Sequence, residues 1–210
     1  MAVIVMRANA LLSTFWGAAK VRPIRKLEDI LAGCLVGDEH CREWLYRSFY
    51  GYVMGVVIRY HKDNEANEEL VNDSFIKIFR HLHSFNYTGP SDELPKLFRG
   101  WIARIASRTV IDFLRIDKNR FQSEEISDLH ITGVQATVME KMNAEEILRM
   151  LDQLPELQKV IFNMFEIEGF KHEEIAAHLN IPVKHSRVYL SRAKERLRSI
   201  YQEYNHRERT

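Results

Sequence analysis

Apolar residues recur along this chain at spacings of three and four, the period of a helix that buries one face. The alternation of apolar and polar residues that predicts strands is nearly absent, and Gly and Pro stand mainly where helices are expected to end. The pattern therefore predicts an all-α protein. We expect helices at about 27–36, 38–61, 64–85 and 97–115, and helical structure again from about residue 143.

Two short helices around a tight turn are predicted within residues 170–200. Ile175, Ala176 and Leu179 form the apolar stripe of the first of them. Asn180 can adopt the left-handed conformation that ends a helix, and Pro182 suits the first turn of the next helix. The arrangement is typical of a helix-turn-helix, which reads duplex DNA.

The second of these helices is expected to have an inner and an outer side. Its inner side carries Leu190, Ala193, Leu197 and Ile200. The residues left on the outer side offer positive charge for phosphates and donors for base edges, and they are Lys184, His185, Arg187, Val188, Ser191 and Arg192. From residue 183 onward eight Lys and Arg stand against three acidic residues, whereas the whole chain has a net charge of +1. A basic helix pair in an ordinary bundle is the alternative interpretation.

An acidic surface and a second basic surface precede this region. The segment 84–95 contains Gly89, Pro90 and Pro95, so it is expected to be a loop. It displays Phe85, Asn86 and Tyr87. The helix before the loop carries an acidic cluster, which is either a protein contact or a solvated face and consists of Asp63, Glu65, Glu68, Glu69 and Asp73. The helix after the loop is expected to pack Trp101, Ile102, Ile105, Ala106 and Leu114 inward and to leave Arg99, Arg104, Arg108 and Arg115 outside.

The domain organisation follows from where periodicity is lost. A chain of 210 residues with 46% hydrophobic residues can bury two small cores. We expect a leader at 1–26, too short in its apolar stretches to span a membrane, and a helical domain at 27–116. A flexible linker is predicted at 117–142, rich in Ser, Asp, Gly and Thr, and a second helical domain with the helix-turn-helix at 143–210.

Candidate catalytic and metal-binding residues are few. Cys34 and Cys41 form no disulfide framework, which is typical of a reducing cytoplasm, and with His40 alone they make a poor zinc site. There is no glycine-rich phosphate loop and no nucleophile with a plausible base. We therefore expect a protein that is not an enzyme, has no cofactor, does not insert into a membrane, and acts in the cytoplasm.

Three stretches together carry a resemblance to a known family. They are EELVNDSFIKIFRHLHSF at 68–85, FRGWIARIASRTVIDFLR at 98–115, and the segment 151–198, which begins LDQLPELQKVIF. Their order and spacing resemble the extracytoplasmic-function (ECF) group of bacterial RNA polymerase sigma factors, over roughly residues 27–204. The resemblance implies binding to core RNA polymerase and recognition of two promoter elements.

The resemblance also implies roles for individual residues. A strip on the helix 64–85 would dock on the clamp helices of the largest polymerase subunit, and it comprises Glu69, Asn72, Asp73 and Ile76. The family usually has Asp and Gln where this chain has Glu69 and Asn72. The loop with Phe85, Asn86 and Tyr87 would capture an unstacked base of the minus-10 element, with Arg104, Arg108 and Arg115 on the adjacent helix. The family often has Asn at the position of Arg108.

The outer side of the second helix-turn-helix helix would read the minus-35 element. The family commonly has Gly-Thr where Lys184 and His185 stand. Further partners implied by the resemblance are the polymerase flap and an anti-sigma factor. Two alternatives stay open on the sequence. A one-component transcription regulator would bind duplex DNA without polymerase, and a nuclease would require a metal-ligand constellation.

Overall fold

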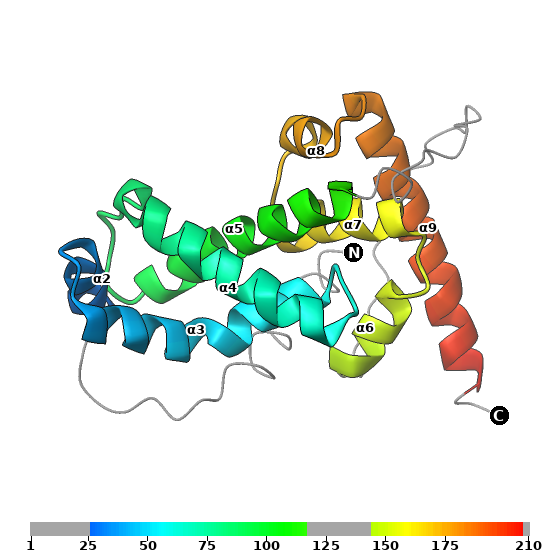
Figure 1. Cartoon of the computed structure of the whole chain (residues 1–210). Coiled ribbons are helices and arrows are strands. Elements are labelled where there is room, and N and C mark those ends of the chain that lie inside the picture. The colour runs from blue at the N-terminus through cyan, green and yellow to red at the C-terminus, as the bar shows by residue number, and fades with distance from the viewer. Residues whose placement is uncertain (1–25, 117–143, 208–210) are drawn as a thin grey trace. The chain divides into compact units, whose positions relative to one another are not determined.

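The computed structural model describes residues 26–116 and 144–207, and all regular structure in these two ranges is helical (Figure 1). The predicted all-α fold class is confirmed. Contacts divide the chain into two compact units, one ending at Val110 near the end of a long helix and the other beginning at Ile111. Within the described ranges no helix is both long enough and apolar enough to cross a bilayer.

The first unit is built from three α-helices, a short 3-10 turn and most of a fourth α-helix, whose last residues, from Ile111, belong to the other unit. These are α2 (Leu27–Leu35), α3 (Glu39–Ile58), α4 (Asn64–His81), η1 (Leu82–Ser84) and α5 (Leu94–Ile116). Gly37, with φ of 87°, reverses the chain after α2, a conformation that a side chain would strain. The Asp38 carboxylate then caps α3 by accepting from the backbone N–H groups of His40 at 2.8 Å and Cys41 at 3.1 Å. The hydrogen bond from Cys41 is the main reason why the pKa of Asp38 is lowered.

The core of this unit lies between α3, α4 and α5. Leu45, Val53, Ile78 and Ile102 are almost completely buried. The rings of Phe49 on α3 and Phe98 on α5 meet edge to face with centroids 5.2 Å apart, as the quadrupoles of aromatic rings favour. These contacts hold α4 and α5 as rigid supports, and leave one face of each helix exposed.

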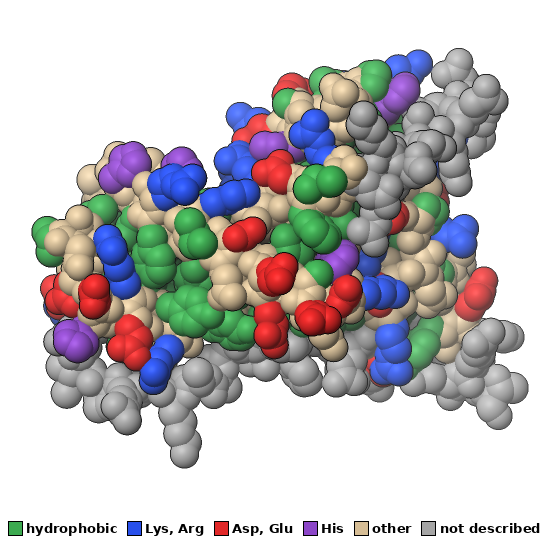
Figure 2. All heavy atoms as spheres, viewed as in Figure 1, with side chains coloured by type: hydrophobic (Ala, Val, Ile, Leu, Met, Phe, Trp, Pro, Cys, Tyr) green, Lys and Arg blue, Asp and Glu red, His purple; other side chains and the backbone are tan. Residues whose placement is uncertain are grey.

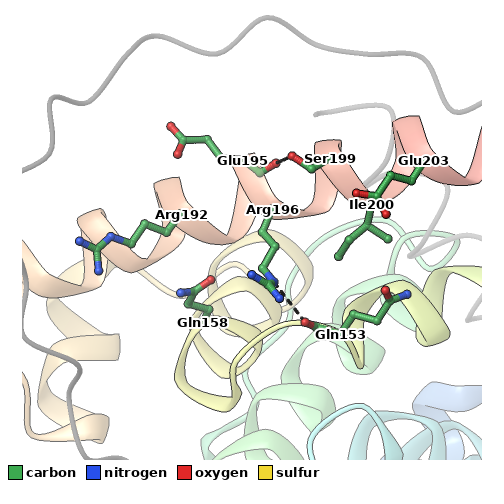
Figure 3. Close-up of a pocket in the computed structure, with 8 residues that line it drawn as sticks. All are labelled: Gln153, Gln158, Arg192, Glu195, Arg196, Ser199, Ile200 and Glu203. Carbon is green, nitrogen blue, oxygen red and sulfur yellow. Dashed lines mark hydrogen bonds between the residues drawn. The ribbon is translucent and has the colours of Figure 1, made fainter.

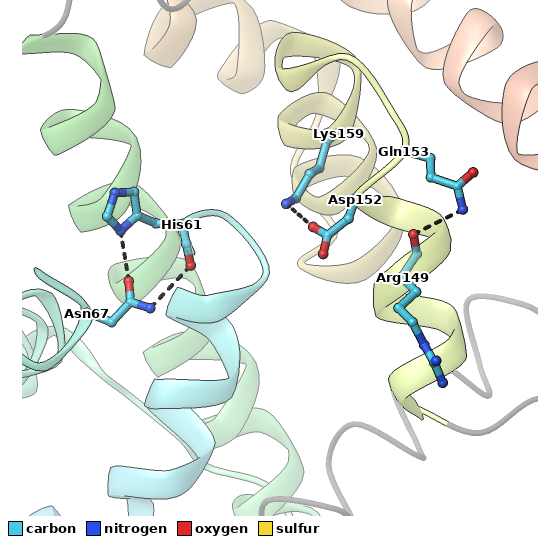
Figure 4. A network of polar contacts seen from close by, with 6 residues as sticks. All are labelled: His61, Asn67, Arg149, Asp152, Gln153 and Lys159. Atoms are coloured by element: carbon cyan, nitrogen blue, oxygen red, sulfur yellow. Dashed lines mark hydrogen bonds and ion pairs between the residues drawn. The ribbon is translucent and has the colours of Figure 1, made fainter. Parts of the chain in front are cut away.

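A buried polar pair fixes the entry into α4. The side chain of Asn67 contacts His61 twice: its Oδ1 lies 2.9 Å from His61 Nδ1, and its Nδ2 donates to the His61 carbonyl at 3.2 Å (Figure 4). Asn67 is 1% exposed and His61 7%. Because buried polar groups are costly unless they are paired, this reciprocal arrangement holds the α3–α4 connection in one geometry.

Several predicted helix ends are wrong by a few residues, and the helix expected at 38–61 ends at Ile58. The helix expected at 64–85 ends at His81 and continues only as the 3-10 turn Leu82–Ser84. The helix expected from 97 begins at Leu94, because Pro95 occupies its first turn, where no intrahelical N–H donor is needed. The loop with the predicted aromatic residues is therefore shorter than expected.

The second unit consists of α6 (Ala144–Leu151), α7 (Glu156–Phe162), a π-helical turn η2 (Asn163–Ile167), α8 (His172–Leu179) and α9 (Val183–Arg207). Val160, Ile161, Met164, Ile175 and Ala193 are fully buried between these helices. The turn between α6 and α7 is tied by an ion pair of 2.6 Å between Asp152 and Lys159 (Figure 4). The leader up to residue 25 and the linker predicted at 117–142 lie outside the described residues, so the predictions made for them stay predictions.

Candidate nucleic-acid interface

The four residues of the predicted strip lie together on the exposed face of α4. Glu69, Asn72, Asp73 and Ile76 are all exposed, and their spacing places them on one face of the helix. Ile76 is 55% exposed, which is unusual for a large apolar residue on a helix whose other Ile, Ile78, is fully buried. In Figure 2, several acidic side chains gather over α4. An apolar residue among exposed acids is a typical composition for a protein contact.

Aromatic residues border this strip. The Tyr46 hydroxyl on α3 donates to Asn72 Oδ1 at 2.8 Å. The Tyr46 ring lies 4.6 Å from the ring of Phe75, which in turn lies 6.1 Å from the ring of Phe79. The guanidinium of Arg42 stands 6.0 Å from the centroid of Phe79. The α4 strip is thus bordered by a row of packed aromatic rings, Tyr46, Phe75 and Phe79, which the helical period of the sequence did not reveal.

The loop between η1 and α5 holds its three predicted residues in different environments. Phe85 is half-buried, and its ring centroid lies 5.2 Å from those of both Phe98 and Trp101. Asn86 is exposed. The Tyr87 hydroxyl donates to the Pro90 carbonyl, and its ring fills the space in which a Cβ on Gly89 would stand. Phe85 therefore anchors the loop on the core, while Asn86 and Tyr87 form its outer part.

The basic face of α5 is present but is less exposed than expected. Arg104 and Arg108 are half-buried, and Arg115 is exposed. Arg99 is also half-buried, with its guanidinium 5.8 Å from the centroid of Tyr52. Long Arg side chains commonly cover apolar surface with their stems and keep the charged head accessible. The structure brings Arg104, Arg108 and Arg115 to one side of the helix.

The helix-turn-helix has the predicted turn. Asn180 adopts the left-handed conformation with φ of 54° and ψ of 46°, and the Ile181 N–H donates to the Ala176 carbonyl at 3.1 Å. Pro182 follows, and α9 begins at Val183. Ile175, Ala176 and Leu179 are buried as expected. The prediction of two helices around a tight turn is confirmed.

The outer side of α9 agrees with the prediction except at one residue. Lys184 and Arg187 are exposed, while His185, Ser191 and Arg192 are half-buried. Val188 was expected on the outer side, but it is only 8% exposed, so that placement is wrong. The reason is that α9 packs on both α7 and α8, which widens its buried face beyond the stripe of Leu190, Ala193 and Leu197.

Two contacts between α8 and α9 were not predicted. His172 Nδ1 lies 2.9 Å from the hydroxyl of Ser186, and Glu173 Oε1 lies 3.5 Å from Arg187 Nη2. Burial lowers the pKa of His172, and the nearby charge of Arg187 lowers it further. The only signal in the sequence was a Ser between basic residues, which predicts no partner by itself.

A pocket of about 450 Å³ lies along the C-terminal part of α9, opposite the α6–α7 turn (Figure 3). Arg196 turns into it and its Nε donates to the Gln153 carbonyl at 3.3 Å. Arg192, one turn earlier, lines the same pocket. Arg196 is thus engaged by a carbonyl of its own unit.

Comparisons with known proteins match the two units separately. Residues 45–120 match the family model for sigma-70 region 2, and residues 144–197 match that for sigma-70 region 4. The ECF RNA polymerase sigma-E factor of Haemophilus influenzae is 28% identical over 178 residues, covering 79% of this chain and 90% of the relative. The ECF RNA polymerase sigma factor SigM of Bacillus subtilis is 20% identical over 159 residues, covering 75% and 93%.

Two solved structures are also similar. One is CnrH in complex with the cytosolic domain of CnrY, with a TM-score of 0.45, 16% identity, and coverage of 85% of this chain and 99% of that one. The other is the sigma factor RpoE in complex with the anti-sigma factor NepR from Bartonella quintana, with a TM-score of 0.46, 16% identity, and coverage of 76% and 96%.

The family models carry the assignment, because they match in the order region 2 then region 4 and together include the α4 strip, α5 and the helix-turn-helix. A one-component regulator would not be expected to match region 2. The chain belongs to the extracytoplasmic-function group of the sigma-70 family, the bacterial RNA polymerase sigma factors, which are transcription initiation factors.

Proposed function

We propose that this sigma factor binds core RNA polymerase through the α4 strip and holds promoter DNA at two elements, one with each unit. The observation that carries the proposal is the separation of three surfaces: an acidic strip with exposed Ile76 on α4, a basic face on α5, and a basic face on α9. Residues 27–116 would act as the region 2 domain and residues 143–210 as the region 4 domain, with 117–142 as their linker.

The α4 strip suits a protein partner better than DNA. Glu69 and Asp73 would be repelled by phosphates, whereas they complement a basic surface such as the one that we propose on the clamp helices of the largest polymerase subunit. Ile76 would supply apolar area at the same contact. Because the strip lies on a helix that is rigidly packed through Phe75 and Ile78, its side chains need no rearrangement of the backbone to dock.

The loop and α5 would act on the minus-10 element. Opening a base pair costs a few kcal/mol of unstacking, and stacking a base on an aromatic ring returns roughly 1–3 kcal/mol. Tyr87 and Asn86 form the outer part of the loop, where a flipped base could be stacked and hydrogen-bonded. Phe85 would support them from beneath, and Arg104, Arg108 and Arg115 would neutralise the phosphates nearby.

The outer side of α9 would enter the major groove of the minus-35 element. Lys184 and His185, in its first turn, suit phosphates, and Arg187, Ser191 and Arg192 suit base edges. Val188 would contribute through packing rather than through contact with bases, since it is buried. Phosphate contacts make the binding salt-dependent, while base contacts determine the promoter that is chosen.

The factor would supply binding free energy and no catalytic residue, and it would work in the cytoplasm, where polymerase and promoter DNA meet. Further partners that we propose are the polymerase flap, through the second unit, and an anti-sigma factor. Base capture would shift the melting equilibrium toward the open complex, which is how a protein without catalytic groups can promote initiation.

In vitro transcription with purified core polymerase on genomic fragments tests the proposal. We expect the protein to direct initiation at specific start sites, and to bind those promoters tightly only when core enzyme is present. Tight and specific binding of the protein alone in a gel shift, together with no effect on core transcription, would contradict the proposal. Cleavage of nucleic acid that depends on a divalent metal would contradict it as well.

A further inference from the structure

The first turn of α8 contacts the first turn of α9 in two ways. One contact is exposed, between Glu173 and Arg187, whose side chains are 63% and 58% exposed. Such an exposed pair contributes little to stability and is easily exchanged for a phosphate. The other contact is buried, between His172 and the fully buried Ser186. Of these two contacts, the buried one is shielded from solvent and can help to fix how the two helices meet.

His172 is held on a second side by an aromatic ring. Its imidazole stacks on Phe165 of η2, with ring centroids 4.4 Å apart and an angle of 25° between the planes. Lys194 also stands near Phe165: its ammonium lies 5.8 Å from the ring centroid and forms an ion pair with Glu166. The imidazole is therefore fixed by stacking and by one hydrogen bond, and it bridges η2 to α9.

Ser186 lies in the turn of α9 that carries the first residues of the proposed DNA-binding face. Lys184, His185 and Arg187 surround it in sequence. A small change in the angle of this turn displaces all three side chains together. Base-specific hydrogen bonds weaken steeply with misalignment, whereas attraction to phosphates does not, so such a change would lower discrimination more than affinity.

We propose that His172 is a positioning residue of the DNA-reading helix, and that its contact with Ser186 sets how sharply the minus-35 sequence is discriminated. The inference rests on the proposed role of α9 in reading the minus-35 element. It assigns to His172 no contact with DNA; the residue acts through Ser186 and the first turn of α9.

The surroundings of His172 favour the neutral imidazole. Arg187 and Lys194 on α9 disfavour a positive charge there, as does the positive end of the α8 dipole at whose first position His172 stands. Glu173 on α8 and Glu166 on η2 act in the opposite direction. Burial is the largest of the effects that disfavour the positive charge, and the pKa of His172 lies below its usual value of 6.5 as a result. Protonation at acidic pH would introduce a charge that this contact opposes.

Substitutions in the full-length protein, assayed as the holoenzyme, test the inference. The measured quantity is the ratio of Kd values for a cognate promoter and for the same promoter with an altered minus-35 element. His172→Phe keeps the stacking on Phe165 but removes the hydrogen bond, and Ser186→Ala removes its partner. We expect each to lower the ratio roughly threefold or more, and the double variant to lower it no further than either one, because both remove the same interaction.

Two further variants separate positioning from general stability. His172→Asn places an amide near the position of Nδ1 and is expected to retain the discrimination that His172→Phe loses. His178→Phe changes a second His of α8, away from its first turn, and is expected to leave the ratio unchanged. If His172→Asn and His172→Phe lower the ratio equally, or if the effects of His172→Phe and Ser186→Ala simply add, the positioning role is wrong.

The dependence on pH gives an independent readout. As pH falls from 7 to values below 6.5, wild-type holoenzyme should lose more discrimination than His172→Phe loses across the same range, and the difference between the two profiles reports His172. The failure of this inference is distinguishable from the failure of the proposed function. If Arg187→Ala and Arg192→Ala abolish minus-35 selectivity but His172→Phe does not alter it, only the positioning role fails; if none of them alters it, α9 does not read this element.

Discussion

The hydroxyl of Tyr46 on α3 donates a 2.8 Å hydrogen bond to Oδ1 of Asn72 on α4. Because this bond uses the amide oxygen, the amide Nδ2 of Asn72 remains able to donate to a partner. The strip thus offers a donor between the acceptors of Glu69 and Asp73. This pattern, together with the exposed Ile76, supports a specific protein contact over a merely solvated acidic face.

Charge reversal in this strip should weaken polymerase binding. Asp73→Lys replaces an exposed acid at the centre of the strip, and we expect the Kd for core polymerase to rise roughly tenfold, about 1.4 kcal/mol. Titration of labelled protein with core enzyme measures the change. Glu39→Lys makes the same charge change at the exposed start of α3 and serves as the matched control. If Asp73→Lys and Glu39→Lys bind core polymerase with equal affinity, the acidic cluster is only a solvated face.

The loop between η1 and α5 should be sensitive to one added methyl group. Gly89→Ala would place a Cβ against the ring of Tyr87, closer than real Cβ contacts come, so the Tyr87 side chain or the loop around it would have to move. We expect promoter melting to fall while binding to core polymerase is retained, as measured by permanganate reactivity of unpaired thymines. Gly100→Ala is the control, because nothing lies within 4 Å of its Cβ and Ala in a helix stabilises by up to about 1 kcal/mol. Normal melting by Gly89→Ala would show that the geometry around Tyr87 is not needed.

Two arginines on successive turns of α9 should differ in their effect on DNA binding. Arg192→Ala is expected to cost about 1–3 kcal/mol at the cognate minus-35 element, since it removes a donor fork from the proposed DNA-binding face. Arg196→Ala removes an Arg whose Nε is engaged by the Gln153 carbonyl, and a smaller loss is expected. Binding of the holoenzyme to cognate and altered promoters measures both. An unchanged affinity of Arg192→Ala would remove this residue from the interface.

The thiol of Cys34 should be unreactive in the folded protein. Burial raises the pKa of Cys34 from 9.0 to about 11, with a smaller contribution from Cys41. At pH 8 the fraction of Cys34 in the reactive thiolate form is therefore on the order of one in a thousand. We expect a thiol-reactive dye to label Cys34 only as the protein unfolds, which peptide mass spectrometry can follow with a denatured control. Rapid labelling at native pH 8 would contradict this expectation.

The raised pKa of Cys34 also predicts how the unfolding free energy changes at high pH. The folded protein favours the neutral thiol, so the unfolded chain loses its proton first as pH rises above 9.0. The contribution of Cys34 to stability is therefore complete below pH 9 and declines as pH rises toward 11. Replacing Cys34 by Ser, which does not titrate in this range, should remove that part of the pH dependence of the unfolding free energy.

The helical period of the sequence determined the fold class and the positions of the main helices. The reason is that burial of one apolar stripe per helix is a local property of the sequence, as Ile175 and Leu179 illustrate. The turn at Asn180 was also predictable, because few residues other than Gly and Asn adopt the left-handed conformation at little cost. The exposed strip from Glu69 to Ile76 followed from the same period, once the inner residues of that helix had been identified.

Only the tertiary structure decided what each side chain touches. Val188 is buried because α9 packs on two helices at once, and Phe85 is an anchor because Phe98 and Trp101 lie beneath it. His172 and Ser186 are separated by fourteen positions and meet across the turn. Such contacts depend on how helices pack, which no local period encodes. The sequence therefore determined which surfaces this sigma factor has, and the packing determined which of their residues are free to bind and which hold the others in place.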